Sequence, residues 1–295
     1  MKFGKVENPE TIDFSLPEDY PDTKRVLMSG KSKSLETYLG CAKWNKQDLK
    51  GFYPKGTKDE LRYYATQFNA IELNATFYRM FTGDQFEKWY LKTPQNFKFF
   101  PKLVQNISHF KRLTDDVQPL VDEYLSNAVR LKEKLGTIFL QMHSNFAPSH
   151  IERLTNFLKQ WPVDIPLAVE LRHPDWYVGE NFTRLNEVLE KYKVASIITD
   201  TAGRRDLLHM RLTNKEAFIR YVGANHTSDY TRLDEWVDRL ATWHGLGLEK
   251  LHFFIHQNVE KESPLLATYF IQKLNERLNL DLKLPEHASN TLGLF

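Results

Sequence analysis

The sequence predicts an α/β protein: a (β/α)8 barrel of the TIM type, formed as a single domain after an N-terminal arm. Three observations support this prediction. Apolar segments of strand length recur along the 295 residues, amphipathic segments of helix length lie between them, and no linker or change of composition divides the chain after residue 36. Eight such units favour a closed barrel over the alternative, an open doubly wound sheet. We therefore expect the arm over residues 1–36 and the barrel over residues 37–295.

The elements are expected in a regular order. Residues 1–36 are rich in Pro, Asp, Glu, Ser and Lys without a sustained period, so the arm should lie on the surface or cap the fold, ordered in part by Phe14 and Tyr20. Strands are predicted at 37–44, 70–74, 97–103, 137–142, 166–172, 195–200, 217–223 and 250–257. Helices are predicted at 57–68, 82–92, 115–135, 149–161, 180–192, 232–244 and 263–277. The Ser263-Pro264 pair is typical of a helix start.

Composition excludes several classes of protein. Forty Lys and Arg residues against 38 Asp and Glu give a net charge of +2, which is too balanced for non-specific wrapping of nucleic acid or for attachment to anionic lipid by charge alone. Cys41 is the one cysteine, which excludes an internal disulfide and favours a reducing compartment. The N-terminus lacks the apolar core of a signal peptide, and no run of about eighteen apolar residues could span a membrane. We expect a cytoplasmic protein with no membrane partner.

The direction of each strand side chain follows from the apolar residues, which should face the helices. In strand six a weaker pattern places Ala195 and Ile197 on the helix side and turns Asp200 inward. Strands three and seven are ambiguous, with Lys102 and Arg220 as the inward choice. The inward residues expected from all eight strands are Gly40, Ala42, Trp44, Glu72, Asn74, Lys98, Phe100, Lys102, Phe139, Gln141, Glu170, Arg172, Asp200, Arg220, His252, Phe254 and His256.

Polar groups gather among these residues toward the carboxyl ends of the strands, where barrel enzymes have their active sites. Buried charges need partners, which are one another, water or a ligand. Converging ionisable groups favour a functional site. The alternative is a self-satisfied ionic layer that closes the barrel, and it stays open because the signs are balanced. The charges are those of Glu72, Glu170 and Asp200 against Lys102, Arg172 and Arg220.

Several short motifs follow one another in a characteristic order. The most specific is Glu170-Leu171-Arg172-His173-Pro174-Asp175-Trp176, and it is preceded by Ile71-Glu72-Leu73-Asn74-Ala75-Thr76-Phe77-Tyr78-Arg79 and by Trp44 with Phe52-Tyr53-Pro54. Further matches are Trp89, Thr93-Pro94, Phe97, Phe99, Lys102, His109, Arg112-Leu113, Leu135-Gly136 and Gln141. Together they cover about residues 37–260 and resemble the YecE-like family, known as domain of unknown function 72. The resemblance implies a TIM-type barrel with no established activity.

Two positions depart from the pattern of that family. The family often has a His before the glycine of strand seven, where this sequence has Val222 before Gly223. It usually has a paired Asn at the end of strand eight, where this sequence has His256-Gln257-Asn258. If these positions set substrate choice, this chain differs from its relatives in its substrate.

Five basic residues at or just beyond the predicted strand ends favour an anion site, because arginine binds phosphate or carboxylate in bidentate fashion and lysine adds a point charge. They are Arg79, Lys102, Arg112, Arg172 and Arg220. A simpler interpretation pairs Arg79 and Arg172 with Glu72 and Glu170. The same two carboxylates are candidates for an acid and a base. For Lys102, a counter-ion role is favoured over a Schiff base.

Two other kinds of site stay open. The ligand types for a divalent metal are present in His173, Glu170, Glu72, Asp200 and His256, but their spacing matches no metal motif and no cofactor is predicted. Aromatic residues after strands one, two and five would stack on bases, or else would seal the barrel mouth. They are Trp44, Phe52, Tyr53, Phe77, Tyr78, Trp176 and Tyr177.

These patterns favour an enzyme, a hydrolase or lyase, that acts by acid–base chemistry on an anionic small molecule, phosphorylated or nucleotide-like. Glu72, Glu170 and Lys102 are the catalytic candidates. The residues expected to bind the substrate are Trp44, Asn74, Tyr78, Arg79, Gln141, Arg172, His173, Asp200, Arg220 and His256. The alternative is a non-catalytic module that binds a nucleotide or single-stranded nucleic acid.

Overall fold

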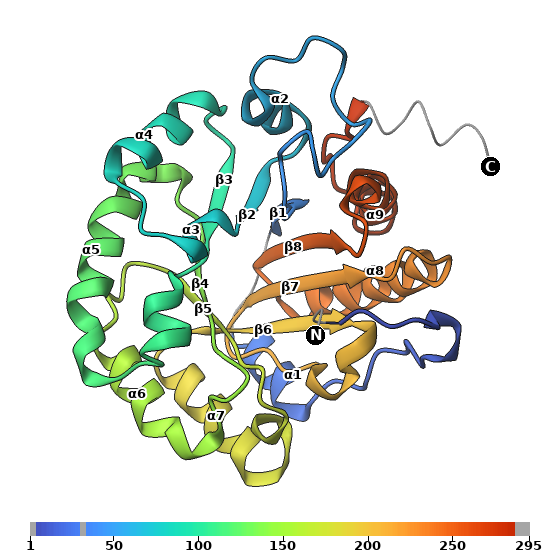
Figure 1. Cartoon of the computed structure of the whole chain (residues 1–295). Coiled ribbons are helices and arrows are strands. Elements are labelled where there is room, and N and C mark those ends of the chain that lie inside the picture. The colour runs from blue at the N-terminus through green and yellow to red at the C-terminus, as the bar shows by residue number, and fades with distance from the viewer. Residues whose placement is uncertain (1–3, 30–33, 287–295) are drawn as a thin grey trace.

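A computed structural model describes residues 4–29 and 34–286. All eight predicted strands are present, and every strand pair in them is parallel. The strands are β1 (Glu36–Cys41), β2 (Ala70–Leu73), β3 (Lys98–Pro101), β4 (Ile138–Gln141), β5 (Leu167–Glu170), β6 (Ala195–Thr201), β7 (Glu216–Gly223) and β8 (Lys250–Gln257). Figure 1 shows them curled about a common centre with the helices on the outside.

Each predicted helix is also present. The helices are α1 (Pro21–Leu27), α2 (Glu60–Gln67), α3 (Ala75–Tyr78), α4 (Gly83–Lys92), α5 (Gln118–Ala128), α6 (Ile151–Gln160), α7 (Gly179–Lys191), α8 (Ser228–Leu246) and α9 (Ser263–Leu278). The segment 115–135 is shorter as a helix than predicted, because Lys132 has a left-handed backbone (φ 51°) that an α-helix cannot contain. Later in the chain, α8 ends at Gly247, which has a φ of 116°, a conformation that favours glycine.

The strands form two hydrogen-bonded sheets. Six lie in the order β1-β8-β7-β6-β5-β4, and β2 pairs with β3. Isolated bridges from Phe99 to Leu135 and from Lys102 to Phe139 join β3 to the β4 side. The result is a mixed α/β fold with a curled, six-stranded parallel half-barrel, and the strand ladders of the described residues do not run unbroken around a complete ring.

Side chains link β1 to β2 where the ladder is interrupted. Asn69 accepts a hydrogen bond from Leu39 N (2.9 Å) and donates one to Thr37 O (2.8 Å). The Tyr64 hydroxyl accepts from Cys41 N (2.7 Å) and donates to Ala70 O (3.1 Å). These two side chains satisfy backbone groups that would otherwise be unpaired at a buried sheet edge.

An apolar cluster fills the centre of the curled sheet. Its buried members are Ala70, Phe100, Phe139, Ala168, Ala195, Ile197, Phe218 and Phe254. The predicted inward directions of Phe100, Phe139 and Phe254 are therefore confirmed. For β6 the predicted direction is wrong, because Ala195 and Ile197 face the centre. All seven residues of β6 are buried, and each face carries an isoleucine together with polar residues, so alternation carries no signal of direction.

The described part of the N-terminal arm packs along α7 and α8. Tyr20 meets the Phe182 ring edge-on with centroids 4.8 Å apart, and Phe14 lies under the Arg232 guanidinium at 4.4 Å. Asp19 accepts a hydrogen bond from Trp243 Nε1 at 2.8 Å. Gly4 O accepts from Gly203 N at 3.0 Å, which brings the arm to the segment that follows β6.

No helix within the described ranges is long and apolar enough to cross a membrane.

Candidate functional site

A layer of charged and polar side chains lies above the apolar cluster, at the carboxyl ends of the strands. Its core residues are Glu72 on β2, Lys102 after β3, Gln141 on β4, Glu170 on β5 and Arg220 on β7. Each is at most 7% exposed. The strands therefore bring together five of the residues predicted for the site, and they do so in a buried region.

Arg220 is the centre of this layer. Its Nε donates to Glu72 Oε2 at 2.9 Å and its Nη2 donates to Glu72 Oε1 at 2.7 Å, a bidentate pair. Its Nη1 donates to Glu170 Oε2. Charge-assisted bidentate contacts of this kind are the strongest that arginine makes, and here one guanidinium binds carboxylates from two strands.

A chain of hydrogen bonds continues from Glu170 to the lysine. Arg172 Nε donates to Glu170 Oε1 at 2.8 Å, and Gln141 Nε2 donates to the same oxygen at 2.9 Å. Lys102 Nζ donates to Gln141 Oε1 at 2.6 Å. The simpler interpretation of Arg172, a partner of Glu170, is confirmed, and Lys102 reaches the carboxylates through an amide.

Two further residues bind Glu72. Asn74 Nδ2 donates to Oε1 at 2.7 Å, and His256 Nε2 lies 3.1 Å from Oε2. His256 Nδ1 is 3.9 Å from Glu260 Oε1. His256 is thus held between two carboxylates while its side chain remains 15% exposed.

The ion pairs fix the protonation of both glutamates. Burial alone would raise the pKa of Glu72, but Arg220 and His256 outweigh burial and hold this pKa well below its usual range. Burial opposes the shift of Glu170 in the same way, and Arg220 with Arg172 lowers the pKa of Glu170 to about 2. Both groups are carboxylates at neutral pH. A division into one acid and one base, as the sequence led us to expect, does not fit these pKa values.

Lys102 has the opposite character. Burial is the largest cause and the nearby Arg220 and Arg172 add to it, so that the pKa of Lys102 falls to about 7. Its Nζ also lies 4.1 Å from the centre of the Phe77 ring. Lys102 is therefore a titratable group near neutral pH within a layer of fixed charges.

His109 and His143 extend the site over the ends of β3 and β4, and the sequence did not single them out as catalytic or binding candidates. His109 lies in the π-helical turn Asn106–Phe110, with its ring centroid 4.8 Å from that of Phe77 and 5.3 Å from that of His143. Burial, Lys102 and His143 lower the pKa of His109 to about 4. The signal that could have found them is their position in the loops after predicted strands three and four, at the end where barrel enzymes have their active sites.

A pocket of about 500 Å³ opens onto this layer from the β1, β2, β7 and β8 side. Its lining includes Glu72, Arg220 and His256 together with the aromatic side chains of Trp44 and Tyr78. This volume lies within the range that small-molecule sites occupy, about 300–1,000 Å³.

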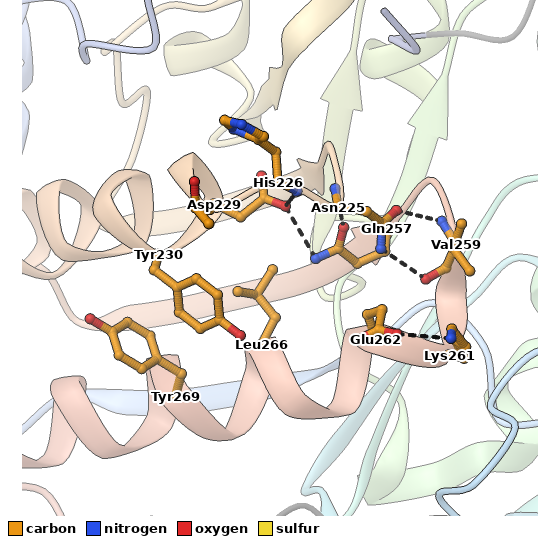
Figure 2. A pocket seen from close by; sticks show the side chains of 11 residues that line it. Asn225, His226, Asp229, Tyr230, Gln257, Val259, Lys261, Glu262, Leu266 and Tyr269 are labelled. Carbon is orange, nitrogen blue, oxygen red and sulfur yellow. Dashed lines mark hydrogen bonds and ion pairs between the residues drawn. The ribbon is translucent and has the colours of Figure 1, made fainter. Parts of the chain in front are cut away.

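A second pocket, of about 620 Å³, lies outside the strands between α8 and α9. Figure 2 shows Tyr230 and Tyr269 side by side on one part of it, with ring centroids 4.9 Å apart, and Gln257 on another. Gln257 Oε1 accepts from Asn225 N at 3.0 Å. A Cβ on Gly223 would lie 2.6 Å from Gln257, so these two residues fit one another. Gln257 and His256 stand where the related family usually has paired asparagines. Gln257 lines this second pocket, whereas His256 lines the pocket at the carboxyl ends of the strands.

Three predicted site residues lie away from the charged layer. Asp200 faces the helices, where it accepts hydrogen bonds from Arg232 and Trp236 at 2.8 Å each, so its predicted inward direction is wrong. His173 accepts a hydrogen bond from Asp175 N at 3.3 Å and shapes the loop after β5. Arg79 is exposed and lies 4.3 Å from the Phe81 ring rather than against Glu72.

Of the remaining residues predicted for the site, some are exposed near the carboxyl ends of the strands and others are buried. Arg112 donates from Nε to His109 O at 3.1 Å. Phe52, Tyr53 and Trp176 are buried, which fits a sealing role, whereas Tyr78 is 70% exposed. Within residues 4–29 and 34–286, no three His, Cys, Asp or Glu side chains come together as a metal ion would require.

Comparisons with known proteins agree with this fold. The family described as protein of unknown function DUF72 matches residues 38–289. The UPF0759 protein YecE of Escherichia coli K12 is 28% identical over 266 residues, which cover 82% of this chain and 93% of YecE.

Two solved structures resemble this chain. A DUF72 family protein from Enterococcus faecalis V583 matches with a TM-score of 0.65 at 16% identity and covers 83% of this chain and 98% of that one. Another, from Thermotoga maritima MSB8, matches with a TM-score of 0.57 at 22% identity, over 81% and 99% of the two chains. These two show the shared fold. The match over residues 38–289 confirms the resemblance in the motifs, and the chain belongs to the DUF72 family.

Proposed function

We propose that the pocket at the carboxyl ends of the strands is the active site of an enzyme that acts on a small anionic molecule, phosphorylated or nucleotide-like. The proposal takes the fold as a (β/α)8 barrel, in which this end carries the chemistry. The observation that carries it is the pair formed by His256 and Glu72, with Nε2 and Oε2 3.1 Å apart in the lining of one pocket.

The pair suits proton transfer. An ionised carboxylate orients a histidine and stabilises the imidazolium that forms when the ring accepts a proton. His256 is then the catalytic residue that moves the proton, and Glu72 is a positioning residue. Arg220 and Asn74 keep Glu72 ionised and fixed in place. Hydrolysis or elimination at a phosphate ester would use such a group on the leaving or attacking oxygen.

The charge of the layer supports an anionic substrate. When Lys102 is protonated, three cations (Lys102, Arg172 and Arg220) face two carboxylates (Glu72 and Glu170), which leaves one positive charge in excess. In a region of low dielectric an excess charge attracts an opposite one strongly. A cytoplasmic location, favoured by the single cysteine, is part of the same proposal.

The test compares His256→Gln with the full-length protein on a panel of sugar phosphates and nucleotides, with product release as the readout. We expect the variant to lose turnover by about 100-fold or more while it still binds the substrate found. His244→Gln is the control, because His244 lies at the end of α8, outside the pocket. Turnover by His256→Gln at the rate of the natural protein would contradict the proposed role.

A second candidate function is binding of a nucleotide or single-stranded nucleic acid without turnover. It is favoured by the 70% exposure of Tyr78, which lines the pocket together with Trp44, because exposed aromatic rings stack on bases. Here oligonucleotides would quench tryptophan fluorescence in a salt-dependent way, Tyr78→Ala would weaken binding, and no member of the panel would be converted. Quenching that Tyr78→Ala leaves unchanged would count against stacking.

A further inference from the structure

Lys102 differs from the other buried lysine of the described residues in what its amine contacts. Lys134 Nζ donates to Tyr90 O and Thr93 O at 2.6 Å each and to Thr93 Oγ1 at 3.3 Å, so its three protons have acceptors. In the described ranges, Lys102 Nζ makes one hydrogen bond, to Gln141 Oε1. Its other near neighbours are the rings of Phe77 at 4.1 Å and Phe139 at 6.0 Å.

The carboxylates near Lys102 are bound by other groups. Arg220 donates to both Glu72 and Glu170, and Arg172 donates to Glu170. No ion pair joins Lys102 to an acidic residue in the part of the chain that the structure describes. An amine that is desolvated, placed beside cations and not paired with an acid is the type that attacks carbonyl carbon in proteins.

We propose that Lys102 is a covalent nucleophile, which forms a Schiff base with a carbonyl compound that also carries an anionic group. This rests on the proposed function, because it places the reacting carbonyl of the anionic substrate at the end of β3. In the step, the lone pair of the neutral amine forms a bond to the carbonyl carbon. The nitrogen releases its two protons, the carbonyl oxygen leaves with two protons as water, and a C=N bond remains, so atoms and charge balance.

The Phe77 ring lies against the amine of Lys102. It belongs to α3, a helix of four residues whose N-cap residue, Asn74, makes no capping hydrogen bond because its side chain binds Glu72. The next residue, Tyr78, is 70% exposed. A carbonyl compound that reaches Lys102 must displace the Phe77 ring. The backbone of α3 is anchored, because Thr76 Oγ1 lies 2.8 Å from both Leu73 O and Lys102 O and Gln105 Nε2 donates to Tyr78 O at 3.2 Å, so the movement required is that of the Phe77 side chain.

The test uses pyridoxal 5′-phosphate, an aldehyde with a phosphate group, on the full-length protein at pH 7.5, followed by borohydride reduction and peptide mass spectrometry. We expect about one label per chain, at Lys102, with Lys134 unlabelled and exposed lysines such as Lys55 labelled far less. Lys102→Arg should lose this label, with the far-ultraviolet circular dichroism of the natural protein as the check that the variant is folded. Phe77→Ala should accelerate labelling several-fold.

The pH dependence adds a readout that simple accessibility would not move. Labelling of Lys102 should rise up to about pH 7 and then level off, because the pKa of Lys102 is about 7, whereas labelling of free lysine in the same solution should continue to rise toward about pH 10. The charged and titratable groups that act on the amine from the surrounding elements are Glu72 (β2), His109 (the turn Asn106–Phe110), Glu170 (β5), Arg172 (after β5) and Arg220 (β7).

The outcomes separate the two proposals. Lys102 labelled no faster than Lys55 would overturn the nucleophile, even if phosphate compounds still bind and are converted by His256. Lys102 labelled equally by pyridoxal, which lacks the phosphate, would keep the nucleophile and remove the anion from the proposed function. A label that persists in Lys102→Arg, on another lysine, would also overturn this inference.

Discussion

Arg220 shows how one residue sets the stability of the whole charged layer. It is buried and binds two carboxylates, of which Glu170 is also bound by Arg172 while Glu72 accepts from no other arginine or lysine of the described residues. Replacing Arg220 with Met leaves Glu72 and part of Glu170 uncompensated in a buried region. Breaking a buried ion pair by removing one partner costs far more than the intact pair contributes, because a bare charge remains.

We therefore expect Arg220→Met to lower the free energy of unfolding by about 3–5 kcal/mol, measured by urea denaturation at pH 7. Arg79→Met is the matched control, because Arg79 is exposed and lies over Phe81. Its change should stay within about 0.5 kcal/mol. Equal losses from the two substitutions would mean that Arg220 does not hold the glutamates.

At the scale of single elements, the junction of β1 and β2 depends on side chains. The Tyr64 hydroxyl is buried and connects Cys41 N to Ala70 O. Tyr64→Phe removes that connection and leaves two buried backbone groups unpaired. We expect a loss of about 1–3 kcal/mol in the free energy of unfolding. Tyr63→Phe, one residue earlier on α2 and partly exposed, is the control and should change little.

Hydrogen exchange would locate the same effect. In Tyr64→Phe the amide of Cys41 should exchange faster, while amides of β7 and β8 keep their protection, because those strands pair along their whole length. Unchanged protection at Cys41 would contradict the role given to Tyr64.

The strands also show how far the sequence predicts side-chain direction. Glu72, Glu170 and His256 were placed correctly, because Leu, Ile, Val and Phe on alternate positions mark the helix side of β2, β5 and β8. Asp200 was misplaced, because both faces of β6 are buried and each mixes an isoleucine with polar residues, and its small residue Ala195 fits either side. Periodicity predicts direction only where the two faces of a strand differ in polarity.

At the scale of the whole molecule, the site is a product of long-range packing that local pattern cannot supply. The sequence identifies which charged residues lie at the ends of strands. It does not show that Arg220 binds both Glu72 and Glu170, and this contact keeps both ionised, so that they cannot act as an acid and a base. His109 and His143 enter the site through the turn Asn106–Phe110 and the loop after β4. Loops of irregular conformation have no period from which their side chains could be placed.

The charges of the fold predict how the molecule responds to acid. Glu72 and Glu170 have pKa values lowered below the ordinary 4.5, so the stability they contribute is present above pH 4.5 and is lost as the pH falls toward 2. Glu170, with a pKa of about 2, contributes about 3 kcal/mol of this. His109, with a pKa of about 4 instead of 6.5, acts in the same direction between those values.

We therefore expect the urea midpoint to begin to fall below about pH 6.5 and to fall most steeply below pH 4.5. The slope of unfolding with urea should stay constant if the folded state keeps its compactness. A midpoint that is level from pH 7 to pH 3 would mean that these glutamates are not held by their cations.

The most direct measurement is the pKa of Lys102. NMR of the lysine side chains gives this pKa, with the Lys102 signal assigned by its loss in Lys102→Arg, and the titration is made with and without sulfate. Sulfate does not titrate in this range, so a shift reports the protein. We predict a pKa near 7 for Lys102, which rises when sulfate occupies the mouth, because an anion stabilises the charged amine. A pKa near 10.5 that sulfate leaves unchanged would contradict the central claim, which is that Lys102 is desolvated and lies among positive charges at the carboxyl ends of the strands.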